Sequence, residues 1–76
     1  MDVRLDLTAR QRQVLAALER LTRDRGYPPT LREIGDEVGL ASASSVLWHV
    51  RVLEAAELIE RQAGRPRAVR AIAAAP

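Results

Sequence analysis

The sequence predicts a small, mainly helical domain that ends in a two-stranded β-hairpin. Two capping boxes are each followed by apolar residues at helical spacing, a third apolar series follows a short turn, and the pattern becomes extended after Glu57. The 76 residues hold a single domain, because a second core would need roughly 50 residues of its own. We expect one domain over residues 1–76, with its core at about 7–72 and a frayed tail at 73–76.

The first helix is expected to begin at Thr8 and to end at Gly26. Thr8 and Gln11 form a capping box, in which the side chains of both residues satisfy backbone donors of the first turn. After Gly26 come Tyr27 and two prolines, which cannot continue a helix because proline lacks the amide donor. The apolar residues in between form one stripe, made of Val14, Leu15, Leu18 and Leu21.

Two further helices are expected on either side of a tight turn. A second capping box begins at Thr30, and Gly39 suits the left-handed residue that ends this short helix. Ser42 or Ser44 then caps a third helix that runs to about Ala56. Two helices joined by a tight turn that contains Gly are typical of the helix-turn-helix, whose second helix usually enters the major groove of DNA.

The last part of the chain is expected to form a hairpin. Leu58–Arg61 and Ala68–Ile72 have an extended pattern and flank a segment that contains Gly64 and Pro66, two residues typical of turns. Three helices followed by such a hairpin make a winged helix-turn-helix. The predicted fold class is therefore mainly α with a small β-hairpin, a three-helix winged helix-turn-helix.

Arginine is concentrated at the end of the chain, although the formal net charge is only +2. Residues 1–60 carry eight Arg and ten acidic residues, whereas residues 61–76 carry four Arg and no acidic residue. Such a cluster is typical of a segment that contacts phosphates, because each neutralised phosphate releases counterions. The alternative is a solvated Arg-rich end that binds nothing.

The composition argues against enzyme chemistry and against bound cofactors. Without Cys, and with His49 as the only imidazole, the chain holds no disulfide framework and no plausible zinc site. Without Lys it cannot form a Ser–Lys pair, a Schiff base or a P-loop. No apolar run approaches the roughly 20 residues that cross a bilayer, and no targeting segment is evident. We expect a soluble, cytoplasmic protein that is not an enzyme and needs no metal or cofactor.

Several separate motifs, in register and at the right spacing, resemble one known family. The chain is similar over residues 7–72 to the N-terminal DNA-binding domain of LexA, the bacterial SOS-response repressor. The matching segments are Leu7–Gln11, Gly26–Thr30, Arg32–Gly35, Val38–Ser42, Ser44–Val46 and Arg65–Val69.

The resemblance implies a transcriptional regulator, a repressor, that binds a specific double-stranded DNA sequence in the bacterial nucleoid. Palindromic operators follow if two copies bind, since one small module makes few contacts. In the family a separate C-terminal domain dimerises and cleaves the linker with a Ser–Lys dyad. Nothing in these 76 residues can encode that domain, so we expect DNA binding without self-cleavage.

The resemblance also assigns roles to individual residues. In the family the third helix enters the major groove, while the start of the second helix and the wing approach phosphates. At the matching positions stand Ser42, Ser44, Ser45, Leu47 and Trp48 for base contacts, and Arg10, Thr30, Arg65 and Arg67 for backbone contacts.

Two departures from the family pattern affect this assignment. The family usually has polar or charged side chains at the positions of Leu47 and Trp48. It also has a basic pair followed by Gly where this chain has Ala55, Ala56 and Glu57. A basic patch of the family is therefore neutral or acidic here.

A helical wheel divides the third helix into an inward and an outward side. The wheel adds Arg51 to the candidate DNA-binding residues, because it lies on the outward side. His49 lies partly inward, and we expect its ring to be structural and to donate to a backbone carbonyl. The inward side holds Val46, His49, Val50 and Leu53, and the outward side holds Ser44, Trp48, Arg51 and Ala55.

Trp48 leaves three interpretations open. It could contact thymine methyl groups, with serine hydroxyls and Arg51 supplying the polar contacts. It could anchor a protein partner or a second copy of the chain, as exposed tryptophans often do in interfaces. It could also fold over the wing or the second helix and complete a poor core.

Overall fold

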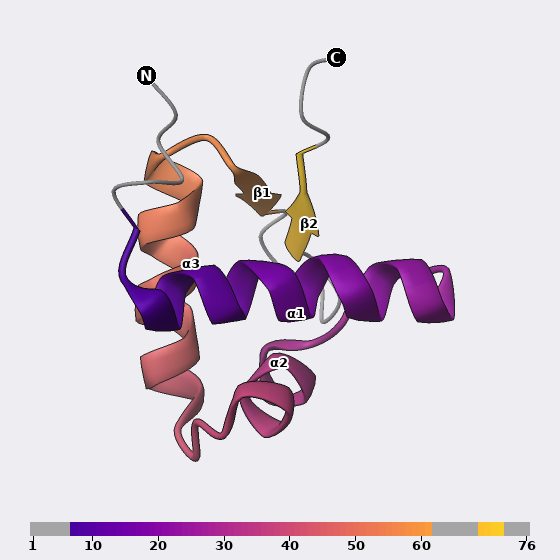
Figure 1. The fold of residues 1–76 in the computed structure, drawn as a ribbon, viewed down its shortest axis with the longest axis horizontal. Helices are drawn as coiled ribbons and strands as arrows, with labels where there is room; N and C mark the ends of the chain where they lie inside the picture. Colours follow the sequence, from indigo (N-terminus) through magenta and orange to yellow (C-terminus); the bar gives the residue numbers. More distant parts are fainter. Residues whose placement is uncertain (1–6, 62–68, 73–76) are drawn as a thin grey trace.

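Three helices and one antiparallel pair of strands make up the part of the chain that the structure describes, residues 7–61 and 69–72 of a computed structural model (Figure 1). The predicted class, a three-helix winged helix-turn-helix with a small sheet, is confirmed. The expected domain limits stay a prediction, since residues 73–76 lie outside the described part. The elements are α1 (Ala9–Arg25), α2 (Leu31–Val38), α3 (Ala43–Ala55), β1 (Ile59–Arg61) and β2 (Val69–Ala71).

Both predicted capping boxes are present. The Thr8 hydroxyl accepts a hydrogen bond from the Gln11 amide at 3.1 Å, and the Gln11 side chain accepts from the Thr8 amide at 3.0 Å. The Thr30 hydroxyl accepts from the Glu33 amide at 3.1 Å, and the Glu33 carboxylate accepts from the Thr30 amide at 2.7 Å. These local bonds fix where α1 and α2 begin.

All three helices end at a residue in the left-handed conformation or just before one. Gly39 has φ of 77°, as the sequence predicts, and Gly26, for which the sequence predicts only the end of α1, has φ of 80°. Glu57, two residues beyond α3, has φ of 60°. Its amide donates to the Glu54 carbonyl at 2.9 Å and the next amide, of Leu58, donates to the Leu53 carbonyl at 3.0 Å. These two bonds form a Schellman motif. The left-handed residue of this motif, here Glu57, is usually glycine.

The core is aliphatic and joins all the elements. In Figure 1, α1 lies across the molecule with α3 near one end, α2 on one side and the strands on the other. The buried hydrophobic residues come from each element and from the segment before α1. The side chains with less than 2% of their surface exposed are Val14, Leu18, Ile34, Val46, Val50, Leu53, Ile59 and Pro29.

The strands pair over three residues each and are slightly shorter than expected. Ile59 pairs with Ala71, and Arg61 pairs with Val69. Leu58 lies outside β1 because its amide is already bound to Leu53 at the end of α3, although its carbonyl accepts from the amide of Ile72 at 2.9 Å. The expected turn at residues 62–66 lies outside the described residues. Buried Ile59 and Val69 anchor the sheet in the core.

Within residues 7–61 and 69–72, the helices are too short or too polar for any of them to cross a lipid bilayer.

Candidate nucleic-acid interface

The first turn of α3 presents free hydroxyl groups. Of the two predicted caps, Ser42 is the N-cap, and its hydroxyl accepts from the Ser44 amide at 3.2 Å. Ser44 and Ser45 are exposed, and within the described residues neither hydroxyl makes a hydrogen bond. Both hydroxyls can therefore donate to or accept from a ligand.

Buried residues fix the rotation of α3 about its own axis. Val46 and Val50 have no exposed surface and pack in the core, as the helical wheel predicts. Residues on the opposite side, Ser44, Trp48 and Arg51, are exposed. The core therefore determines which side of α3 faces solvent, and this side holds most of the predicted base-contacting residues.

Trp48 stands on the exposed side of α3. Its side chain is 59% exposed, and its ring lies edge-on to the ring of His49, with 5.1 Å between centroids and 83° between planes. The interpretation in which Trp48 completes the core is therefore wrong. The reason is that the aliphatic residues on the inward side of α3 already fill the core.

His49 is half-buried, as expected, but its hydrogen bonding differs from the expectation. The buried Nδ1 atom has no hydrogen-bond partner among the described residues, whereas we expected the ring to donate to a backbone carbonyl. The ring packs against Trp48 instead.

The exposed side of α3 is polar at its start, apolar in the middle and positive further on. Leu47, beside Trp48, is half-buried. From Leu40 to Leu53 the only formally charged side chain is that of Arg51, which is exposed and has no ion pair among the described residues. The helix N-terminus adds partial positive charge. The segment itself carries no carboxylate, while Asp36 of α2 lines the groove beside Ala43 and the exposed Glu54 follows Arg51 by three residues.

The start of α2 adds a residue that the sequence reasoning missed. Arg32 is exposed, and no carboxylate of the described residues lies within 4 Å of its guanidinium. A groove of about 300 Å³ separates α2 from the start of α3, and Arg32 lines it together with Ala41 and Ala43. Arg32 is the only basic residue of α2. This isolated positive charge is the one sequence signal that could have identified Arg32 as a candidate DNA contact.

Thr30, predicted to contact the DNA backbone, caps α2 with its hydroxyl, as described above. This bond uses the hydroxyl as an acceptor and leaves its proton available to donate. Arg65 and Arg67, predicted for the same role, lie outside the described residues. Of the two Arg residues in the strands, Arg70 lies 3.9 Å from the carboxylate of Glu60, to which it is paired across the sheet.

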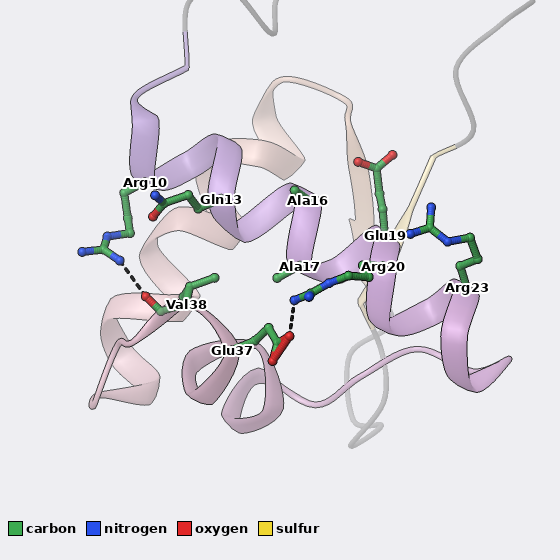
Figure 2. A pocket seen from close by; sticks show the side chains of 9 residues that line it. All are labelled: Arg10, Gln13, Ala16, Ala17, Glu19, Arg20, Arg23, Glu37 and Val38. Carbon is green, nitrogen blue, oxygen red and sulfur yellow. Dashed lines mark hydrogen bonds and ion pairs between the residues drawn. The ribbon is translucent and has the colours of Figure 1, made fainter.

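Arg10, the fourth predicted backbone contact, lies in a different groove. Its Nη1 atom donates to the Val38 carbonyl at 2.6 Å, so it binds the last turn of α2 to the first turn of α1. Figure 2 shows Arg10 and Arg20 extending from α1 toward α2, where Arg20 pairs with Glu37. This groove, of about 680 Å³, is lined by α1 and the end of α2, without any residue of α3.

The candidate site offers hydrogen bonding and apolar contact rather than reaction chemistry. In residues 7–61 and 69–72, His, Asp and Glu side chains do not gather in groups of three that could hold a metal ion. Hydroxyl groups, a guanidinium and an apolar ring on an exposed helix are the groups that contact base edges in the major groove.

Comparison with known proteins identifies the family of the chain. The family model described as LexA DNA binding domain matches residues 4–68. LexA repressor 2 of Nocardia farcinica is 53% identical over 64 residues, which are 84% of this chain and 26% of that protein. The LexA repressor of Thermobifida fusca is 52% identical over 63 residues, 83% of this chain and 25% of that protein.

A more distant relative agrees. The LexA repressor of Desulfitobacterium hafniense strain DCB-2 is 45% identical over 64 residues, 84% of this chain and 31% of that protein. The chain thus spans about a quarter to a third of the length of these curated relatives. Because the family model covers most of the sequence and the helices lie where the family pattern predicts them, this chain belongs to the LexA DNA-binding domain family.

Proposed function

We propose that this chain binds a specific sequence of double-stranded DNA and acts as the DNA-binding domain of a LexA-type transcriptional repressor of the SOS response. The observation that carries the proposal is the exposed side of α3, on which Ser44, Trp48 and Arg51 stand and where the segment from Ser42 to Leu53 carries no carboxylate. We assign to the chain only the binding step, which takes place in the bacterial cytoplasm.

Each residue has a proposed role. Residues of α3 enter the major groove and contact base edges, while basic and hydroxyl side chains elsewhere position the domain on phosphates. Arg10 keeps this role beside its bond to Val38, because a guanidinium has five N–H donors and that bond uses one. The base-contacting set is Ser42, Ser44, Ser45, Leu47, Trp48 and Arg51, and the backbone set is Arg10, Thr30, Arg32, Arg65 and Arg67.

Two copies are expected on a palindromic operator. A single module of this size buries only about 600 to 1,000 Å² on DNA, and specific binding at physiological salt requires more contacts. Two half-sites one helical turn of DNA apart would supply them.

Selection from a random duplex library, followed by titration at two salt concentrations, tests the proposal. We expect enriched sequences and a steep decrease in affinity as salt rises, since each phosphate contact contributes about −0.9 to the slope of log K against log salt. Arg51→Ala should weaken binding, whereas Arg23→Ala is a control of the same charge in the last turn of α1, far from α3 in Figure 1. No enrichment, with a flat salt response, would refute the proposal.

A second candidate function is a protein interaction through the same surface. The observation that favours it is the 59% exposure of Trp48, because exposed tryptophans are enriched among interface hot spots. Sedimentation of the chain without DNA distinguishes the two. Concentration-dependent self-association that Trp48→Ala abolishes, with DNA preference unchanged, would support the protein interaction and remove Trp48 from the DNA-binding set.

A further inference from the structure

We infer that Trp48 and Leu47 read the C5-methyl group of thymine, so that each half-site contains a thymine whose methyl group is required for full affinity. This inference rests on the proposed function, because it assumes that α3 lies in the major groove. The inference names the chemical group of the DNA that is recognised. It assigns this recognition to two protein positions, Leu47 and Trp48, at which the family has polar or charged side chains.

The chemistry of the two side chains excludes most other base contacts. Leu47 has no hydrogen-bonding group, and the indole of Trp48 has one donor and no acceptor. Neither can accept from the amino group of adenine or cytosine, and neither can form the bidentate contact that identifies guanine or adenine. The one apolar group on the major-groove edge of a base pair is the thymine methyl group.

The indole also has a ring neighbour on its own helix. The ring of His49, the next residue of α3, contacts the indole edge-on, and His49 is itself half-buried. Buried Val46 and Val50 fix the side of the helix from which the ring extends. A supported ring loses little conformational freedom on binding, so burial of a methyl group against it is retained as affinity.

Charge favours DNA over a second copy of the chain as the occupant of this surface. The exposed side from Ser42 to Leu53 carries Arg51 and no carboxylate. A two-fold contact through the same patch would bring two Arg51 side chains into one interface, where the exposed Glu54, one helical turn along, is the one carboxylate that α3 of each copy supplies. A phosphate backbone beside the same patch neutralises Arg51.

The proposal predicts how the affinity changes when a single methyl group is removed from the DNA. Deoxyuridine pairs with adenine as thymine does but lacks the methyl group, and 5-methylcytosine carries a methyl group at the same ring position. Replacement of the contacted thymine by deoxyuridine removes the apolar contact and leaves the hydrogen-bonding pattern of the pair unchanged. We expect about fourfold weaker binding at that position, the factor that corresponds to one buried methylene-sized group.

The experiment uses the duplex with the highest enrichment in the library selection, resynthesised with deoxyuridine at one thymine at a time. Fluorescence anisotropy of labelled duplexes gives the Kd of each. In the original chain, one or two replacements per half-site should weaken binding about fourfold, and the others should be neutral. In Trp48→Gln the replacement that faces Trp48 should lose its effect, because its apolar partner is absent, while a replacement that faces Leu47 should keep it.

Ile72→Gln provides the matched control. Ile72 is also exposed, at 41%, and directly follows β2, a strand that lies far from the start of α3 in Figure 1. This variant should retain the fourfold effect. Circular dichroism verifies that both variants are folded. The replacement series on the original chain does not depend on any protein variant, so it tests the inference even if a variant fails to fold.

The outcomes separate the inference from the proposed function. An enriched sequence in which no deoxyuridine changes the Kd as much as twofold overturns the inference and leaves the proposed function intact. Fourfold effects that all persist in Trp48→Gln overturn the role of Trp48. The absence of any enriched sequence overturns both.

Discussion

The amide N–H of Leu40 donates to the carbonyl oxygen of Gly35 at 2.9 Å, and this bond closes the turn between α2 and α3. The turn lies so close to α2 that a Cβ atom on Gly35 would stand 2.9 Å from the Leu40 carbonyl oxygen and 3.1 Å from Cγ2 of Val46. The missing side chain of Gly35 thus allows α3 to approach α2. The position of the candidate DNA-binding helix depends on this contact.

Gly35→Ala should therefore destabilise the fold. Alanine alone would favour the helix by about 1 kcal/mol, but the added methyl group meets backbone and a buried side chain, and overpacking of this kind costs about 1–3 kcal/mol. We expect a net loss of up to about 2 kcal/mol in the free energy of unfolding, measured by urea titration with circular dichroism. A variant at least as stable as the original chain would show that the turn can move away without cost.

Glu57→Gly should stabilise the protein. Glu57 has φ of 60°, a conformation that costs a residue with a side chain about 1 kcal/mol or more relative to glycine. We expect a gain of about 1 kcal/mol in the same urea titration. Glu54→Gly, which removes the same charge inside α3, is the matched control and should lose about 1 kcal/mol. Equal effects of the two changes would contradict the strain assigned to Glu57.

Substitutions of Glu33 should separate its two roles. One carboxylate oxygen caps α2 at the Thr30 amide, and the other lies 2.5 Å from Nη1 of Arg25 at the end of α1. Glu33→Gln keeps a capping acceptor and loses the ion pair, so we expect a loss of at most about 0.5–1 kcal/mol that disappears at high salt. Glu33→Ala also loses the cap, and we expect it to cost about 1 kcal/mol more at any salt concentration. A loss for Glu33→Gln that salt does not reduce would argue against the ion pair.

Arg32→Ala should reduce the salt dependence of DNA binding. If Arg32 contacts a phosphate, its removal weakens all duplexes by a similar factor and lowers the slope of log K against log salt by about 1. Binding to the selected duplex and to a scrambled duplex, each at several salt concentrations, measures both effects. Arg23→Ala, with its side chain 74% exposed at the end of α1, should leave the slope unchanged. An Arg32→Ala slope equal to that of the original chain would remove Arg32 from the interface.

The sequence predicted the features that depend on neighbours along the chain. The caps at Thr8 and Thr30, the end of α1 at Gly26 and the left-handed Gly39 are decided within a few residues, so their patterns are visible in the sequence. The outward position of Trp48 follows from helical periodicity in the same way. The elements and the orientation of α3 could therefore be predicted without coordinates.

Features that depend on packing between elements could not be predicted. Arg10 binds the Val38 carbonyl only because the end of α2 lies beside the first turn of α1. The residue type of Glu57 does not signal its left-handed conformation, since glutamate usually avoids it; the one signal is the Gly that the family has at this position, and the motif that imposes the conformation joins α3 to the strand. Whether a basic residue such as Arg32 has an acidic partner also depends on the assembled fold.

The exposed indole has a practical consequence for measurements on this molecule. Trp48 is the only tryptophan in the chain and is largely solvated in the folded state, so its emission should change little when the chain unfolds. The same emission should respond strongly when a macromolecule covers α3. The protein therefore carries an intrinsic optical reporter on the exposed side of α3, and contact with a partner there should be detectable without any attached dye.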